Sequence, residues 1–119
     1  MIKHIRNLLL TLFIIGIFSF QNKEGFLPTK LKISVIDNLG NFVEGASVSI
    51  YTSEEDYRAS ENAIARVSSN EKGQALFKGL EPISYYIDAQ KGDLNNNAAG
   101  VKTAALKEGR VNKVNTIIE

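Results

Sequence analysis

The sequence contains no cysteine, no tryptophan and a single histidine, His4. Without cysteine the chain cannot form disulfides, supply a thiolate nucleophile or carry a lipid on an N-terminal cysteine. His4 precedes an uncharged apolar run, residues 8–20, so the chain after this run has neither histidine nor cysteine. Zinc sites built on histidine and a carboxylate, and Ser-His-Asp or Cys-His catalytic arrangements, are therefore excluded from that part of the chain.

Residues 1–21 have the pattern of a secretory signal peptide. Lys3 and Arg6 give a basic start, and residues 8–20 follow without a charge. A membrane-spanning helix needs about 20 apolar residues, so a cleaved signal helix is favoured over a retained anchor. We expect cleavage between residues 19 and 21, with secretion across the inner membrane to the periplasm, the cell surface or the extracellular medium.

The charge of the chain is nearly balanced, with 14 Lys and Arg residues against 13 Asp and Glu residues. Removal of Lys3 and Arg6 with the signal leaves 12 basic against 13 acidic residues, a net charge of −1. The remaining lysines are scattered along the sequence. A nucleic-acid-binding surface needs a clustered basic face, so no nucleic-acid partner is predicted, and no membrane span after signal cleavage.

Alternation of apolar and polar residues predicts short strands through most of the chain. In residues 31–37, for example, Leu31, Ile33 and Val35 share one face. Seven such runs are separated by turn sequences, at residues 31–37, 46–52, 64–69, 74–80, 83–90, 101–106 and 111–118. Short strands at this spacing are typical of a sandwich or barrel. We expect one domain, residues 30–119, folded as a seven-stranded antiparallel β-sandwich.

Two polar stretches fall outside these runs. Residues 22–29 contain a glycine and a proline and are expected to form a short lead-in to the domain. After the second expected strand, Ser53 precedes three acidic residues at positions 54–56. A serine ahead of acidic residues is typical of a helix N-terminus, where the serine caps and the acids favour the helix dipole.

Glycine and alanine between the first two strands carry a family resemblance. The pattern G-x-x-V-x-G-A-x-V is formed by Gly40, Val43, Gly45, Ala46 and Val48. Further along, N-x-x-G-x-x-x-F-x-x-L is formed by Asn70, Gly73, Phe77 and Leu80, and the run YYI follows at Tyr85, Tyr86 and Ile87. Over residues 31–118 the chain resembles the carboxypeptidase regulatory-like domain, a transthyretin-like or prealbumin-like sandwich, as in small secreted members from Bacteroidetes-type bacteria. The resemblance is to an accessory domain rather than a catalytic one, and its motif residues imply turns and core positions.

Carboxylates are the remaining groups that could carry catalysis. Glu54, Glu55 and Asp56 are the densest acids, and a solvated first helical turn is their favoured interpretation. A Ser-Lys pair is permitted by residue type, although no S-x-x-K motif occurs. We therefore predict a protein that is not an enzyme.

The loop that contains Asp93, Asn95 and Asn97 fits the start of a calcium-binding EF-hand loop. That loop requires glycine and glutamate where this chain has Ala98 and Ala104, so the EF-hand is excluded. A looser calcium site and simple turn-forming asparagines stay as alternatives, the second being favoured. No metal site or cofactor is predicted.

Exposed tyrosines and asparagines are the candidate ligand-binding residues. Alternation places Tyr85 in the core, which leaves Tyr51 and Tyr86 pointing outward, where they could stack on a sugar or form ordinary cross-strand aromatics. The candidate set is Tyr51, Tyr86, Asn95, Asn96 and Asn97. The favoured function is a secreted binding or structural module of the bacterial envelope that contacts an envelope protein through loops or an edge strand. The alternative is a carbohydrate-binding module with a glycan partner.

Overall fold

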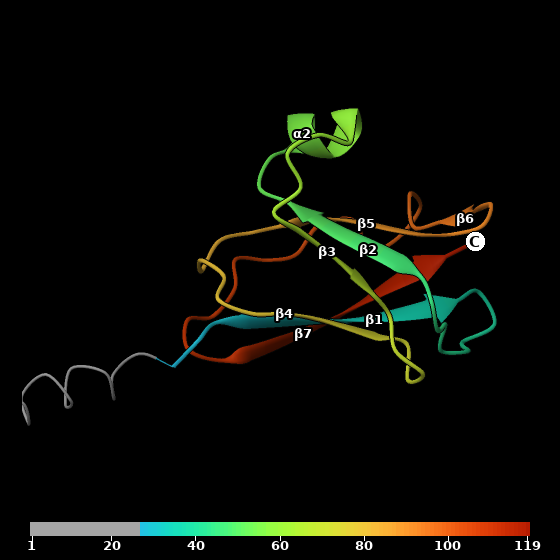
Figure 1. Cartoon of the computed structure of the whole chain (residues 1–119), viewed down its shortest axis with the longest axis horizontal. Coiled ribbons are helices and arrows are strands. Elements are labelled where there is room, and N and C mark those ends of the chain that lie inside the picture. The colour runs from blue at the N-terminus through green and yellow to red at the C-terminus, as the bar shows by residue number, and fades with distance from the viewer. Residues whose placement is uncertain (1–26) are drawn as a thin grey trace, which may run out of the picture.

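Two β-sheets pack face to face in this computed structural model, which describes residues 27–119 (Figure 1). One sheet has three strands in the order β4-β1-β7, and the other has four in the order β3-β2-β5-β6. The seven-stranded β-sandwich that the sequence predicts is confirmed. The expected signal peptide, residues 1–21, and the first part of the lead-in lie outside the described residues.

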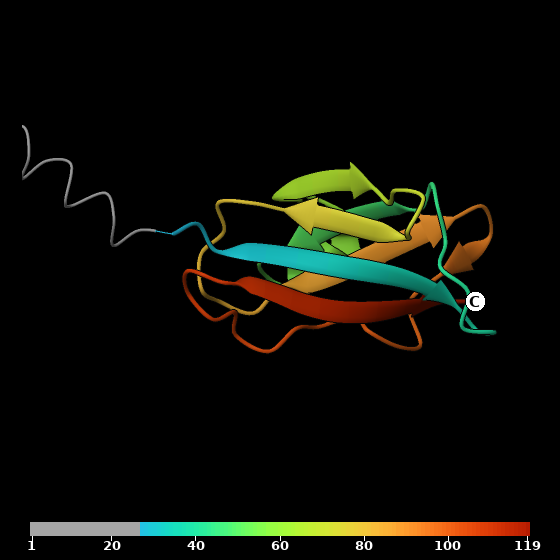
Figure 2. The same cartoon turned by 90° about the horizontal axis from the view of Figure 1, so that it is seen from below.

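The three-stranded sheet is organised around β1 (Lys30–Asp37), which lies between β4 (Gln74–Phe77) and β7 (Val111–Ile118). β4 runs antiparallel to β1, whereas β7 runs parallel to it along the whole strand (Figure 2). The expectation of purely antiparallel pairing is therefore wrong for this pair. Parallel neighbours need a long crossover, and here the crossover is nearly the entire chain between the first and last strands.

The four-stranded sheet is antiparallel throughout. β2 (Ser47–Tyr51) pairs with β3 (Ala65–Ser68) on one side and with β5 (Tyr86–Lys91) on the other, and β5 continues into the short β6 (Leu94–Asn95). The helix α2 (Glu54–Ala59) connects β2 to β3 on the side of this sheet that faces away from the sandwich (Figure 1). This helix covers part of the outer face of the four-stranded sheet and leaves the rest of that face exposed.

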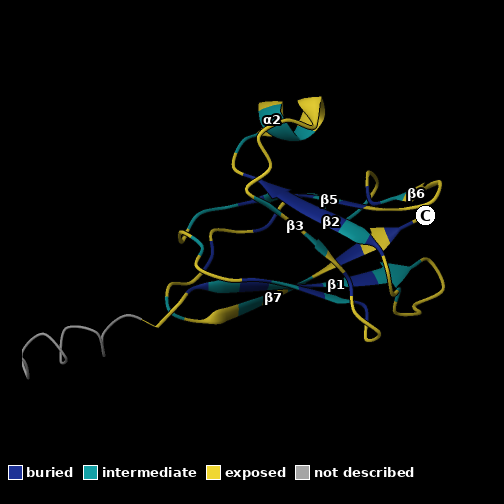
Figure 3. Cartoon of the chain, in the orientation of Figure 1, coloured by how far each residue is buried: buried dark blue, intermediate teal, exposed yellow. Residues whose placement is uncertain are grey.

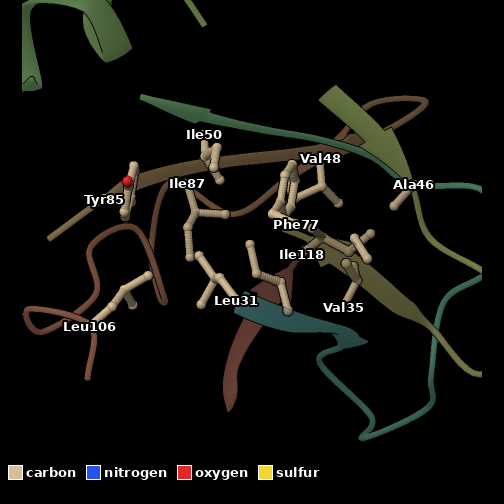
Figure 4. Close-up of a cluster of buried hydrophobic side chains, with 13 residues drawn as sticks. Leu31, Val35, Ala46, Val48, Ile50, Phe77, Tyr85, Ile87, Leu106 and Ile118 are labelled. Atoms are coloured by element: carbon tan, nitrogen blue, oxygen red, sulfur yellow. The ribbon is translucent and has the colours of Figure 1, made fainter. Parts of the chain in front are cut away.

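Side chains between the two sheets form a continuous apolar core (Figures 3 and 4). β1 contributes Leu31, Ile33 and Val35, all with no exposed surface, as its alternating pattern predicts. Burying a side chain of this size contributes about 1.5–3 kcal/mol. Tyr85 is also buried in this core, as predicted, with 2% of its surface exposed.

The prediction of a strand at residues 101–106 is wrong. This segment runs beside the start of β5 but makes one isolated bridge there, between Lys102 and Tyr86. The Thr103 side chain interrupts regular pairing, because its Oγ1 accepts from the Tyr85 amide at 3.0 Å while its own amide donates to the Tyr85 carbonyl. A side-chain acceptor replaces a backbone acceptor, so the ladder does not extend.

The turn after β1 explains the first motif of the sequence. The Asp37 carboxylate accepts hydrogen bonds from the amides of Leu39 and Asn41, each at 2.9 Å. Gly40 completes the turn with a φ of +87°, a conformation that favours glycine. Val43 then packs against the core. These motif residues serve the fold, as the family resemblance implies.

Gly100 lies against β7 so closely that a side chain would not fit. Its φ is +82°, and a Cβ atom there would lie 2.7 Å from the Thr116 Cα. We expect Gly100→Ala to lower the free energy of unfolding by about 3 kcal/mol, since it adds a backbone clash to left-handed strain. Urea unfolding measures the loss.

Gly92→Ala is the matched control for this substitution. Gly92 also has a positive φ, +58°, but a Cβ there would meet nothing within 4 Å. Only the conformational cost of about 1 kcal/mol is expected. Equal losses for the two variants would show that the close approach to β7 does not constrain the fold.

Candidate functional site

The outer face of the four-stranded sheet carries the tyrosines singled out in the sequence. Alternation correctly places Tyr51 on this face, but the side chain has no exposed surface. The ring of Tyr57, from α2, lies edge-on against it with centroids 6.0 Å apart. The predicted exposure of Tyr51 is therefore wrong, because a helix that comes directly after β2 folds back over it.

Helix α2 forms as its sequence predicts. Ser53 is the N-cap, and its Oγ accepts from the Asp56 amide at 3.1 Å. The acidic residues lie in the first turn, and Glu54 forms an exposed salt bridge to Arg58 at 2.6 Å. These groups are solvated, which agrees with their interpretation as a helical turn. The functional consequence of the helix is the position of Tyr57.

Tyr57 and Tyr86 form a stacked pair on the outer face. Their ring centroids are 6.0 Å apart with an interplanar angle of 28°. The Tyr57 hydroxyl donates to Asn97 Oδ1 at 3.3 Å, and Lys102 Nζ lies 5.3 Å from the centroid of the Tyr86 ring. Tyr86 is half-buried. Its ring is thus held by an aromatic neighbour and a cation, and part of it reaches solvent.

A polar depression of about 290 Å³ opens beside this tyrosine pair. We call it the tyrosine hollow; it is lined by Tyr57, Arg58, Ser60, Asp88, Gln90 and Asn97. The Gln90 amide donates to both carboxylate oxygens of Asp88, at 3.1 and 3.2 Å. The hollow therefore presents a carboxylate, two amides and a guanidinium to a small polar molecule.

Tyr86 and Asn97 are the two members of this arrangement that the sequence predicts; the others are not predicted from it. Asp88 and Gln90 follow Tyr86 at every second position of β5, so alternation could have placed them on the same face. Tyr57 gave no such signal, because its position depends on how α2 folds back over the sheet.

The three consecutive asparagines at the end of β6 and directly after it have separate roles. Asn96 is fully buried: its Oδ1 accepts from the Ala89 amide at 3.0 Å, and its Nδ2 donates to the Ile87 carbonyl and Thr116 Oγ1. Asn95 is half-buried, and its Oδ1 accepts a hydrogen bond from the Asn97 amide. Only Asn97 lines the hollow. The prediction that all three face a ligand is wrong for Asn96, which supports the fold.

A second surface follows the outer edge of β7. The Lys30 amide donates to the Arg110 carbonyl, so every second residue from Arg110 directs its backbone groups toward β1. Val111, Lys113 and Asn115 direct theirs the other way. Within residues 27–119 no hydrogen bond joins the backbone groups of these three residues to another segment, whereas Ile117 beyond them donates to Ala99. Gly100 packs against the Asn115 carbonyl, so we call Val111 and Lys113 the open edge.

A groove of about 390 Å³ runs along the first half of this edge. We call it the β7 groove; residues 103–107 form one wall and residues 110–114 the other. Asn112 holds the two walls together, since its Oδ1 accepts from the Lys107 amide at 2.8 Å and its Nδ2 donates to the Lys107 carbonyl. The groove is thus held in place by hydrogen bonds, and it lies beside the unpaired backbone groups of β7.

Neither surface resembles a metal centre. In the described part of the chain, no group of three or more histidine, cysteine or carboxylate side chains is placed to hold a metal ion. Over the same residues, no helix has the length and apolar character needed to cross a membrane.

No family model matches the chain, and no curated protein matches it in sequence. Solved structures do match the fold. The Bacillus anthracis TIE protein covers 78% of this chain at 19% identity with a TM-score of 0.57. A streptococcal ancillary pilin covers 77% at 14% identity with a TM-score of 0.57, and BcpA, the major pilin subunit of Bacillus cereus, covers 78% at 15% identity with a TM-score of 0.50.

The matches cover only parts of these proteins: 16% of the TIE protein, 32% of the ancillary pilin and 30% of BcpA. At such low identity they establish a shared fold and nothing further. The chain is a small β-sandwich similar in structure to parts of the TIE protein and of these pilins.

Asn96 is predicted to be a structural residue and Asn97 a surface residue. We expect Asn96→Ala to lower the free energy of unfolding by about 2–4 kcal/mol, because it leaves buried backbone and hydroxyl groups without partners. Asn97→Ala, at an exposed position, should change it by less than about 0.5 kcal/mol. Thermal or urea unfolding distinguishes them, and equal stability of the two variants would contradict the assignment.

Tyr57 is predicted to make the stability of the protein fall at alkaline pH. Burial, followed by the nearby Asp88 charge, raises the pKa of Tyr57 above its usual 10.0. Because the pKa is higher in the folded than in the unfolded protein, the neutral hydroxyl of Tyr57 stabilises the fold below pH 10. This contribution to stability is lost as the pH rises through the pKa of the folded state. We expect the tyrosinate absorbance difference between wild type and Tyr57→Phe to titrate above 10.0, with a shallower alkaline decline in stability for the variant. A midpoint at or below 10.0 would contradict this.

Proposed function

We propose that the protein is a secreted, non-enzymatic binding module of the bacterial envelope that pairs an extended segment of another protein with the open edge of β7. The observation that carries this proposal is the coincidence of unpaired backbone groups at Val111 and Lys113 with the β7 groove. Strand addition to an open edge gives affinity through main-chain hydrogen bonds, and neighbouring pockets give specificity.

The fold and the chemistry of the chain support this proposal. The similar solved structures are named as pilins and as the TIE protein, so a similar sandwich occurs in pilus subunits. The motif residues Gly40, Val43 and Phe77 lie at a turn and in the core, which supports membership of the carboxypeptidase regulatory-like family. The signal-like start of the sequence supports secretion to the periplasm or cell surface.

Carbohydrate binding at the tyrosine hollow is the second candidate. The observation that favours it is the Tyr57–Tyr86 pair beside the side chains of Asp88, Gln90 and Asn97. Aromatic rings with nearby amides and carboxylates suit the apolar faces and hydroxyl groups of a sugar. Lys102 lies over the Tyr86 ring, however, and competes for the surface on which a sugar would stack. The open edge is therefore the better supported site.

A peptide-display selection tests the first proposal. Wild type and Lys113→Pro are screened against a library of short random peptides. Proline at 113 removes an amide on the open side of β7 and leaves the pairing with β1 intact, and edge strands tolerate it. We expect wild type to enrich peptides that Lys113→Pro does not bind. Lys113→Gln is the matched control, since it loses the charge but keeps the amide.

The same preparations, together with Tyr86→Ala, are tested for retardation in gels that contain polysaccharides. Retardation that Tyr86→Ala loses and Lys113→Pro keeps would support the carbohydrate module and overturn the edge-strand proposal. Peptide binding that Lys113→Pro keeps at full strength would also overturn it. Circular dichroism and urea unfolding of each variant show that the fold survives.

A further inference from the structure

Lysines that are scattered in the sequence gather beside the open edge. Lys32 of β1 pairs in register with Lys113 of β7, so two cations lie directly opposite each other on the outer face of the three-stranded sheet. Lys107 and Arg110 line the β7 groove with Lys113, and Lys30 opens the adjacent strand.

Among residues 27–119, no carboxylate lies within salt-bridge distance of these cations. In the described part of the chain the one salt bridge is between Arg58 and Glu54, on α2. Glu108 lies in the turn between Lys107 and Arg110, and it forms no salt bridge there. Like charges placed directly opposite on a sheet are destabilising. The fold therefore keeps a row of basic side chains along the edge where a partner strand would lie. We call this row the basic rim; it consists of Lys30, Lys32, Lys107, Arg110 and Lys113.

The basic rim disfavours a second copy of the chain as the partner. Pairing β7 with β7 of another copy would bring Arg110 and Lys113 of one molecule toward the same residues of the other. Lysine on an edge strand is a common protection against such self-pairing. An acidic strand meets no such repulsion. Its carboxylates would lie next to the same lysines that repel each other when two copies of β7 pair.

The two sides of a guest strand would meet different surroundings. On the outer face its side chains neighbour Lys113 and, one strand further, Lys32. On the other face they meet the wall of the β7 groove, where Ala104 and Ala105 are exposed and Val114 is half-buried. Since successive side chains of a strand point to opposite faces, the surroundings favour acidic residues that alternate with small ones.

We propose that the open edge of β7 binds an extended acidic peptide segment in which acidic and small residues alternate. This inference rests on the proposed function and specifies the chemistry of its partner. The backbone of the peptide hydrogen-bonds to Val111 and Lys113, and its carboxylates lie against Lys113 and Lys32 on the outer face.

Synthetic peptides test the inference. Three labelled peptides alternate threonine with glutamate, with glutamine or with lysine, and their binding is followed by fluorescence anisotropy. We expect the glutamate peptide to bind about tenfold more tightly than the glutamine peptide at low salt, with a difference that shrinks as salt screens the charges. The lysine peptide should bind least.

Charge reversal at the edge supplies the protein-side test. Lys113→Glu should lose the preference for the glutamate peptide and shift it toward the lysine peptide. Lys72→Glu is the matched control, because Lys72 is exposed in the turn between β3 and β4 and only its backbone amide is hydrogen-bonded. It makes the same change in net charge and should leave the order of affinities as in wild type.

A fully N-methylated glutamate peptide keeps the charge but has no backbone donors, and its binding should fall at least about tenfold. Equal binding of the methylated peptide, or of an acidic polysaccharide, would overturn strand addition in favour of charge attraction alone. Equal binding of glutamate and glutamine peptides, with loss in Lys113→Pro, would overturn the acidic preference and leave the proposed function standing. Binding of none of the peptides would overturn both.

Discussion

The parallel pairing of β1 with β7 is the constraint on which the rest of the structure depends. It joins the first strand to the last along eight residue pairs, from Lys30 with Val111 to Asp37 with Ile118. It makes β1 the central strand and leaves the backbone groups of Val111 and Lys113 on β7 without a partner among residues 27–119. The same register sets Lys32 opposite Lys113. Both the open edge and the basic rim therefore follow from one strand pair, whose formation requires almost the whole chain to fold between its partners.

Beyond this pair, a buried polar junction ties β7 to the other sheet. Asn96 bonds to the backbone of β5 and to Thr116 on β7, and Thr116 Oγ1 in turn donates to the Gly100 carbonyl at 3.0 Å. Buried polar groups that are fully paired are rigid and specific in geometry. The junction fixes the second half of β7 against the loop after β6. The first half has no such cover, which is why the open edge occurs there and not along the whole strand.

The alternation of apolar and polar residues is sufficient to predict the sandwich, because within each strand it indicates which residues face the core. It correctly predicts that Leu31 and Tyr85 are buried. Alternation says nothing about what covers the outer face, so it could not show that α2 buries Tyr51. Nor could composition reveal that Asn96 is buried or that Lys32 and Lys113 meet, since both depend on strand pairs that are distant in the sequence. The candidate site was therefore less predictable than the fold.

The two surfaces of the domain differ in how much of their chemistry is already used within the molecule. In the tyrosine hollow, Asp88 accepts from Gln90, Asn97 accepts from Tyr57, and Lys102 lies over Tyr86, so a ligand must displace existing contacts. Along the open edge, the amides of Val111 and Lys113 and the cations beside them have no hydrogen-bond or salt-bridge partner among residues 27–119. Binding costs least where no internal partner is lost. This difference is the physical reason why we propose β7 as the interaction site, where the lysines that disfavour self-pairing would also favour an acidic partner.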